Sequence, residues 1–198
     1  MADFKTALAR RRSNYRIDSS SAIPDGEIRN IVEYAVVNTP SAFNSQSARV
    51  VLLFGEQHGK FWEIVGEALR KLVPADNFKA TGDKIASFAA GHGTVLFYED
   101  QEVIRGLQAS FPLYADAFPG FSQNSAGMVQ HVVWVMLRDA GLGATLQHYG
   151  NLVQEEVAKQ WNLPAGWLLV AQMPFGGIVE EASVPERQPI DLRVKCFA

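Results

Sequence analysis

The chain has 198 residues, 47% of them hydrophobic and 11% aromatic, with 18 Lys and Arg against 21 Asp and Glu for a net charge of -3. This composition excludes a disordered chain, and the small negative charge excludes a general attraction for nucleic acid or for an anionic membrane. The length fits one domain spanning residues 1–198, because a chain of this size buries its apolar surface in a single core.

The cysteine content and the apolar runs indicate a protein of a reducing compartment. Cys196 is the one cysteine, so no internal disulfide or CxxC cluster can form, and we expect its thiol to be inert. The basic N-terminal segment lacks the apolar core of a secretory signal. The longest apolar stretch, residues 132–137, is far shorter than the roughly 20 residues of a membrane-spanning helix. We therefore expect a cytoplasmic protein without a membrane segment.

Amphipathic spacing of apolar residues predicts four helices in the first half of the chain, over residues 3–12, 28–38, 56–72 and 77–90. Pro40 stops the second of them after Thr39, since the residue before a proline disfavours the helical conformation. Two continuous apolar runs are typical of strands buried on both faces, at residues 48–54 and 94–98.

The second half of the chain predicts a buried helix flanked by irregular segments. Residues 106–121 mix Pro, Gly and aromatic residues and favour a short helix within an irregular segment, whereas residues 125–140 are apolar on nearly every face and end at Gly141. Shorter elements follow, namely strands at 144–146 and 167–173, a helix at 155–161 and an extended final segment. This alternation indicates a three-layer α+β or α/β domain without regular βαβ units.

Standard motifs for nucleotides and metals are missing from the sequence. Gly91 and Gly93 precede a predicted strand instead of following one, so they cannot form a dinucleotide fingerprint, and no Walker lysine pattern occurs. The four histidines lie far apart, without an HExxH pattern or a close carboxylate partner. We therefore expect no metal.

Four arginines lie within seven residues near the N-terminus, at Arg10, Arg11, Arg12 and Arg16, with Ser13 among them. Guanidinium groups form bidentate hydrogen bonds to phosphate oxygens, and a serine hydroxyl can donate one more. A solvated basic helix end, which complements the helix dipole, accounts for the same cluster. Taken alone, the cluster favours this second interpretation.

A polar loop over residues 39–46 joins a predicted helix to a buried strand. The carboxamides of Asn44 and Gln46 match the alternating donors and acceptors of a flavin's uracil-like edge, and Pro40 and Phe43 offer a flat apolar wall. An ordinary polar turn accounts for these residues equally well. Two later segments, residues 141–149 and the terminal pair Arg193 and Lys195, are weak signals when each is considered separately.

Six segments in this order resemble the nitroreductase family, and in particular its yeast-type and bacterial copper-induced branch. They are residues 11–15 (RRSNY), 40–46 (PSAFNSQ), 93–100 (GTVLFYED), 111–114 (FPLY), 141–149 (GLGATLQHY) and 171–176 (AQMPFG). The resemblance covers almost the whole chain. It implies a three-layer α/β/α fold with a central mixed sheet and an extended C-terminal arm, in a homodimer whose two FMN sites are each built from both chains.

The resemblance also implies the residues that bind FMN. By motif position, Arg11 and Ser13 hold the phosphate and ribityl chain, with Arg193 and Lys195 near the phosphate. The loop around Pro40 approaches from the partner chain, and the segment around Gln147 lies along the flavin with backbone contacts near N5. The complete implied set is Arg11, Arg12, Ser13, Tyr15, Pro40, Ser41, Asn44, Gln46, Leu146, Gln147, His148, Arg193 and Lys195.

One position departs from much of the wider family. Tyr15 stands where many members have an Arg or Lys, although the branch that the chain resembles shares the tyrosine. A cation there would stabilise negative charge on reduced flavin, so Arg16 and Arg12 are the candidates to replace it.

The implied activity is FMN-dependent reduction of nitroaromatic or quinone-like acceptors by NAD(P)H, in ping-pong cycles through flavin N5. The flavin carries the chemistry, so no catalytic protein residue is expected. Four aromatic residues are candidates to wall the acceptor pocket or to pack the dimer contact, namely Phe111, Tyr114, Phe118 and Phe121. The sequence leaves open a flavin sensor or storage protein, a cofactor-free binding domain, and the choice between NADH and NADPH.

Overall fold

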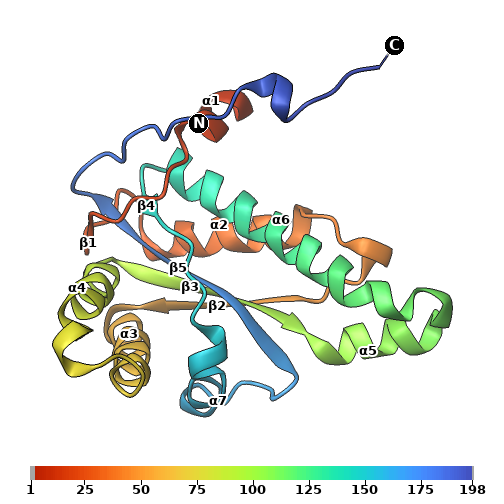
Figure 1. The fold of residues 1–198 in the computed structure, drawn as a ribbon, viewed down its shortest axis with the longest axis horizontal. Helices are drawn as coiled ribbons and strands as arrows, with labels where there is room; N and C mark the ends of the chain where they lie inside the picture. Colours follow the sequence, from red (N-terminus) through yellow and green to blue (C-terminus); the bar gives the residue numbers. More distant parts are fainter. Residues whose placement is uncertain (1–2, 198) are drawn as a thin grey trace.

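The computed structural model describes residues 3–197 as a five-stranded sheet with helices packed on both faces (Figure 1). The strand order is β1-β5-β3-β2, and β4 pairs with β5 beside this path. The strands are β1 (Ile17–Asp18), β2 (Ala48–Phe54), β3 (Gly93–Asp100), β4 (Gly143–Ala144) and β5 (Trp167–Ile178). The predicted three-layer α+β fold is confirmed.

The sheet is antiparallel in every pairing between these strands, where a mixed sheet was expected. The chain leaves β2 at Phe54 and enters β3 at Gly93, and these two residues are register partners. The intervening helices α3 (Gly55–Arg70) and α4 (Phe78–Ala89) therefore return the chain to the same end of the sheet, so β3 runs opposite to β2. Within residues 3–197, parallel pairing is limited to an isolated bridge between Ser13 and Ala144.

Alternate residues of the central strand β3 point into two separate cores, as the period of a strand requires. Val95 and Phe97 pack in the core beneath α2 (Asp25–Asn38) and α6 (Phe118–Asp139). Leu96 and Tyr98 pack in the opposite core, beneath α3, α4 and α7 (Gly150–Gln160). The remaining helices, α1 (Phe4–Arg10) and α5 (Gln101–Ser110), lie toward opposite ends of α6 (Figure 1).

Several elements differ from their predicted bounds. The segment 106–121 is more helical than expected, because α5 continues to Ser110, a 3-10 turn follows, and α6 begins at Phe118 with Pro119 in its first turn, where proline is tolerated. α7 begins at Gly150 instead of 155. β5 extends to Ile178, and its added residues pair with β1, a two-residue strand that the sequence did not predict.

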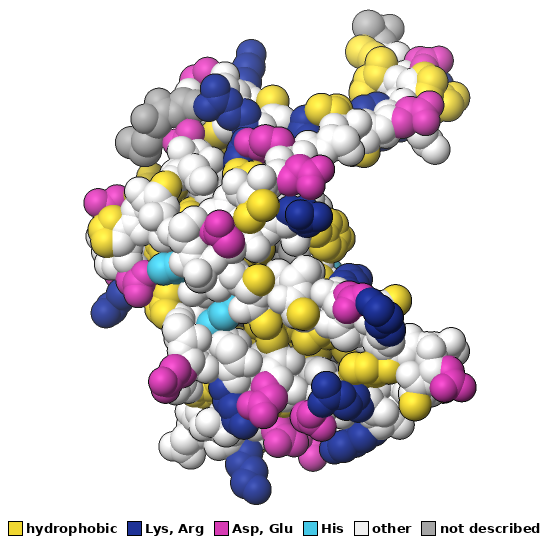
Figure 2. All heavy atoms as spheres, turned by 90° about the vertical axis from the view of Figure 1, so that its left-hand side faces the viewer, with side chains coloured by type: hydrophobic (Ala, Val, Ile, Leu, Met, Phe, Trp, Pro, Cys, Tyr) yellow, Lys and Arg dark blue, Asp and Glu magenta, His cyan; other side chains and the backbone are white. Residues whose placement is uncertain are grey.

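The segment after β5 forms an arm that first runs past α1 and whose end stands away from the body of the molecule (Figures 1 and 2). It contains one 3-10 turn (Ile190–Leu192) and is otherwise extended, as predicted. Its apolar side chains are exposed, up to 94% for Phe197, and Figure 2 shows hydrophobic side chains gathered at its end. Among the helices of residues 3–197, none combines the length and apolar character needed to cross a bilayer.

His92 joins three segments around β1. Its Nε2 lies 2.6 Å from Asp25 Oδ1 in α2, and its Nδ1 lies 2.9 Å from the carbonyl oxygen of Ser19. Partial burial alone would lower the pKa of His92, but the hydrogen bonds to Asp25 and Ser19 and the Asp25 charge outweigh it, so the pKa is raised. The protonated ring can donate at both nitrogens.

We expect His92 to stabilise the fold more at acidic than at alkaline pH. A raised folded-state pKa gives a contribution that is complete below the unfolded value of about 6.5 and lost as pH rises through the folded value. His92→Gln should therefore lower the free energy of unfolding, measured by urea titration, more at about pH 5.5 than at about pH 8.5. An equal loss at both pH values would contradict this linkage.

Candidate functional site

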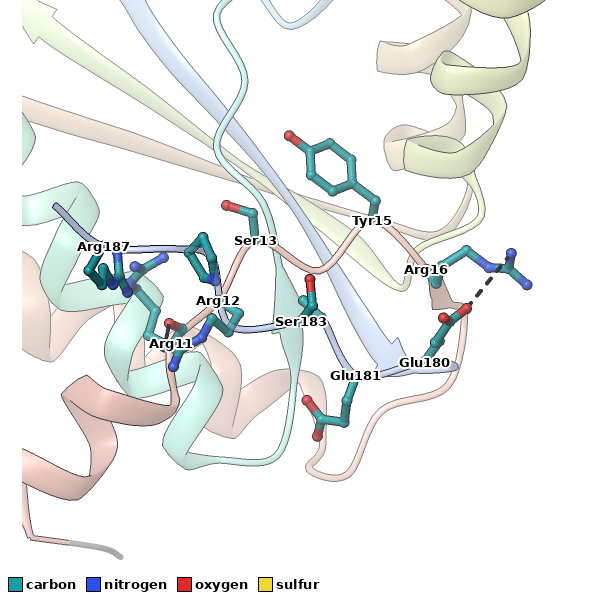
Figure 3. Close-up of a pocket in the computed structure, with 11 residues that line it drawn as sticks. Arg11, Arg12, Ser13, Tyr15, Arg16, Glu180, Glu181, Ser183 and Arg187 are labelled. Carbon is teal, nitrogen blue, oxygen red and sulfur yellow. Dashed lines mark hydrogen bonds and ion pairs between the residues drawn. The ribbon is translucent and has the colours of Figure 1, made fainter.

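The first part of the candidate site is a cavity of about 680 Å³ between the segment 11–16, which joins α1 to β1, and the segment 180–187 of the arm (Figure 3). The segment 11–16 is fixed to β4, because the Asn14 N–H donates to the Ala144 carbonyl over 3.0 Å. Gly143 permits this close approach, since a Cβ there would lie 3.0 Å from the Asn14 Cβ. Arg11, Arg12, Ser13 and Tyr15, all predicted from sequence, line this one cavity.

Arginine side chains gather on one side of this cavity (Figure 3). The Arg11 guanidinium lies 4.3 Å from the centre of the Trp134 ring. Burial lowers the pKa of Arg11, and the charges of Arg12 and Arg187 lower it further. Neither Arg11 nor Arg187 has an ion pair with any residue of 3–197, whereas Arg12 donates hydrogen bonds to backbone carbonyl oxygens at the end of α1. The charges of Arg11 and Arg187 therefore lack a protein counter-ion, whereas the two carboxylates that line the cavity, Glu180 and Glu181, pair with Arg16 and Arg138.

The two arginines considered as substitutes for a cation at position 15 are both engaged elsewhere. Arg12 Nη1 donates to the carbonyl oxygens of Ala9 and Arg11 over 2.6 and 2.7 Å, at the end of α1. Arg16 lies 4.0 Å from Glu180 and points away from the Arg11 side of the cavity (Figure 3). The role of either arginine toward reduced flavin stays a prediction.

Tyr15 lies instead near a second phenol. Its ring packs 6.1 Å from Phe88 in α4. Burial raises the pKa of the Tyr149 hydroxyl, and the nearby Tyr15 raises it further. Tyr15, which lines the cavity, therefore has Tyr149 as a neighbour, although Tyr149 lies outside the cavity lining.

The second part of the candidate site is the loop after α2, which lines a separate cavity of about 360 Å³. Four residues predicted from sequence, Pro40, Ser41, Asn44 and Gln46, line it together. Phe43, Asn44 and Gln46 have φ values of 56°, 49° and 47°. Residues other than glycine rarely adopt this left-handed conformation, and such strained residues cluster at functional sites.

Aromatic side chains surround Phe43 at the tip of this loop. Its ring centre lies 5.0 Å from that of Phe111, 5.9 Å from that of Tyr114 and 5.1 Å from that of Phe118. Phe121 contacts the cluster through Phe118, at 5.9 Å. Phe118 is buried, whereas Phe43, Phe111 and Tyr114 are 48%, 41% and 47% exposed. The four predicted pocket residues thus meet the predicted loop, which the sequence did not indicate.

The segment 144–149 runs beside β5. Gln147 and Gln172 exchange two backbone hydrogen bonds of 2.7 and 2.9 Å, and the Tyr149 N–H donates to Gln172 Oε1 over 2.6 Å. Gln172 Nε2 and the whole Asn14 amide are buried without a partner among residues 3–197. Leu146 is half-buried, and exposed His148 lines a third cavity of about 510 Å³, between α5, α6 and α7.

The two parts of the site lie at different points along α6. The Ala42 N–H of the loop donates to Ser125 Oγ over 3.3 Å, whereas Arg11 lies on Trp134. Ser125 and Trp134 are roughly 14 Å apart along the helix axis. One chain therefore does not bring the arginine cavity and the aromatic loop together.

Two of the predicted cations lie outside the arginine cavity. Arg193 and Lys195 are exposed in the arm beyond Pro189, and Arg187 lines the cavity instead. Sequence reasoning missed Arg187, and the signal that was present is a basic residue between Pro185 and Pro189.

The antiparallel three-layer fold, with an unpaired arginine cavity and an aromatic loop along one helix, defines a protein of the nitroreductase-like class. The family model "Nitroreductase family" matches residues 8–177. The chain is 34% identical to HBN1 and 32% to nitroreductase FRM2, both of Saccharomyces cerevisiae, each over 178 residues, which are 89% and 88% of this chain and 88% and 87% of the relatives. The chain belongs to the nitroreductase family.

Solved structures agree with this assignment. Nitroreductase CinD from Lactococcus lactis, in complex with nicotinic acid, superposes with a TM-score of 0.90 at 38% identity, over 99% of this chain and all of that one. A second CinD structure, with chloramphenicol, gives 0.88 at the same identity and coverage. Structures from Desulfovibrio desulfuricans and Exiguobacterium sibiricum, both in complex with FMN, are 17% and 16% identical over nearly their full lengths, with TM-scores of 0.71 and 0.73, and share the fold.

Proposed function

We propose that this chain is a cytoplasmic, homodimeric FMN-dependent oxidoreductase that uses NAD(P)H to reduce nitroaromatic or quinone-like acceptors. The observation that carries the proposal is the unpaired positive charge of Arg11 and Arg187 beside Ser13. A partly buried guanidinium without a counter-ion is costly, and a phosphate dianion accepts charge-assisted hydrogen bonds from it. The donor set therefore fits a phosphate monoester such as that of FMN.

Other residues near this cavity suit the rest of the cofactor. The buried amides of Asn14 and Gln172 have unused donor atoms next to the segment that carries Gln147. Buried polar groups in native proteins normally have partners. Tyr15 and Tyr149 would offer neutral hydroxyl groups to the ring system in place of the usual cation, and such uncharged donors stabilise an anionic reduced ring less than a cation does.

The partner chain would complete the site. Each chain carries the arginine cavity and the aromatic loop at separate points of α6, so the loop around Pro40 and Asn44 would serve the cavity of the other subunit. The arm supports this arrangement, because exposed apolar side chains on an extended segment suit burial against a second protein surface. In the dimer the arm would also bring Arg193 and Lys195 near the phosphate.

The aromatic loop would bind the acceptor. Phe43, Phe111 and Tyr114 are partly exposed around one point, and flat rings of this kind stack on planar aromatic molecules. Bound FMN would supply the redox chemistry, taking hydride from NAD(P)H and passing electrons to the acceptor. The protein's own contribution is to hold the phosphate, to shield the ring between subunits, and to orient donor and acceptor in turn.

Anaerobic reduction of the FMN-loaded protein tests this function. We expect NADH or NADPH to bleach the flavin within seconds, and a nitroaromatic or a quinone to restore its absorbance. Slow bleaching by both nicotinamides would favour a flavin sensor or storage protein. A protein that takes up no FMN would contradict the proposal and support a cofactor-free binding domain.

A further inference from the structure

Glu99, near the end of β3, is a buried carboxylate that the proposed function does not use. It is 1% exposed, and its Oε2 accepts hydrogen bonds of 2.6 Å from both Ser47 Oγ and Ser122 Oγ. Its other oxygen, Oε1, has no partner among the residues that the structure describes. A buried carboxylate costs stability unless its environment compensates, so hydrophobic packing alone does not account for Glu99 at this position.

The two serines place Glu99 between the aromatic loop and α6. Ser47 follows directly on the left-handed residues and lies 3.3 Å, Oγ to Oγ, from Ser45 of the loop. Ser122 lies in the first part of α6, one turn before Ser125, whose Oγ accepts the Ala42 N–H. One carboxylate oxygen of Glu99 therefore links Ser47, which directly follows the loop, to Ser122 of the helix on which the loop rests.

Asp100, the next residue of β3, contacts the end of the same loop through Arg49 and through its own N–H. Asp100 accepts a 2.9 Å hydrogen bond from Arg49 Nη2, and Arg49 Nη1 donates to the Gln46 carbonyl over 2.8 Å. The Asp100 N–H also donates to the Ser47 carbonyl. Two consecutive residues at the end of β3 thus hold the end of the loop: Glu99 accepts from Ser47, and Asp100 acts through its own N–H on Ser47 and through Arg49 on Gln46.

We infer that Glu99 is a positioning residue, which holds the loop 43–46 against α6 and thereby sets the acceptor side of the site. The inference about the loop depends on Ser47, Ser122 and Glu99 alone, whereas its kinetic consequence rests on the proposed function. The left-handed conformation of Phe43 disfavours the observed loop by itself, so contacts with neighbouring residues must hold the loop in this conformation.

Thr94 supplies a matched control on the same strand. Its Oγ1 is also buried and also has two side-chain partners, His58 Nδ1 at 2.8 Å and Trp62 Nε1 at 2.9 Å, but these belong to α3, on the opposite face of the sheet. Thr94→Val should therefore remove a comparable buried pair of hydrogen bonds without touching the loop.

Amide hydrogen exchange provides a readout that does not depend on flavin or activity. The N–H groups of Asn44 and Gln46 donate to Ser41 O and Ser41 Oγ, over 3.0 and 2.9 Å. We expect Glu99→Ala to speed exchange at these amides about tenfold, as loss of two buried hydrogen bonds implies. Glu99→Gln should restore most of the protection, because its amide oxygen still accepts both serine protons. Thr94→Val should leave these amides unchanged.

Kinetics then test the link to the site. In FMN-loaded protein, Glu99→Ala should raise the KM for a nitroaromatic acceptor about tenfold, with Glu99→Gln much closer to wild type and Thr94→Val equal to it. Loop exchange in Glu99→Ala that matches Thr94→Val would overturn the inference. An inactive or flavin-free wild-type protein that still shows the exchange pattern would refute the proposed function and leave the role of Glu99 intact.

Discussion

Replacing Arg11 and Arg187 together by alanine is expected to weaken FMN binding about a hundredfold. Each guanidinium would give up a charge-assisted hydrogen bond to phosphate, and two such losses amount to about 3 kcal/mol, or about a hundredfold in Kd. Arg11 is held on the Trp134 ring and has no protein counter-ion to release, so its removal should cost little folding stability. Fluorescence titration of the flavin-free protein with FMN gives the measurement.

Two control variants make this result specific. Arg29→Ala removes an exposed arginine of α2 that is paired with Glu33, and it should leave the Kd unchanged. Arg193 and Lys195, replaced together, test whether the arm also reaches the phosphate in the assembled protein. Undiminished FMN affinity in the Arg11 and Arg187 double variant would show that the cavity is not the phosphate site.

Gly176→Ala is expected to lower the free energy of unfolding by about 3 kcal/mol, the upper part of the usual range for overpacking. A Cβ at Gly176 would overlap the Asp18 carbonyl oxygen and would lie 2.9 Å from the backbone nitrogen of His92. Both obstacles are backbone atoms, which cannot turn aside as a flexible side chain would. β1 and β5 would have to separate at this point.

Urea unfolding of the flavin-free protein measures this effect, with Gly59→Ala as the control. Gly59 lies exposed in α3 with no atom within 4 Å of its would-be Cβ, so alanine there should stabilise the helix by about 0.8 kcal/mol. β1 directly follows Tyr15 and Arg16, so Gly176→Ala should also weaken FMN binding. A loss below about 1 kcal/mol would mean that the two strands yield easily at this contact.

The elements with strong internal patterns could be predicted from the sequence. The continuous apolar run 48–54 coincides with β2 at both ends, because an unbroken apolar run is a local signal. The expected burial on both faces was wrong for β2, which is the edge strand of the sheet and is mostly half-buried, whereas it holds for β3. β1 has only two residues, and it forms because Ile17 and Asp18 pair with Ile178 and Gly177. Pairing between segments so far apart in the sequence leaves no local signal.

The candidate site likewise has features with a local signal in the sequence and features that depend on contacts between distant segments. Residue types singled out the motif around Arg11 and Ser13 and the loop from Pro40 to Gln46 but left a solvated helix end and an ordinary turn as alternatives. The family resemblance assigned both to a site, and each set does line one cavity. The left-handed conformation of Phe43 could not be predicted, because a phenylalanine disfavours it and the contacts with Phe111 and Phe118 that compensate come from a distant segment. Arg187 was missed because the path of the arm determines which of its cations meets the cavity. The roles of all these residues in binding stay predictions.

The distance along α6 between the arginine cavity and the aromatic loop has a genetic consequence for the proposed dimer. One inactive allele altered at Arg11 and another altered at Phe43 would complement each other when co-expressed. In a mixed dimer, the cavity of the second chain and the loop of the first are both wild type and form one working centre, while both defects fall in the other. Pairs of alleles altered in the same part would show no such recovery.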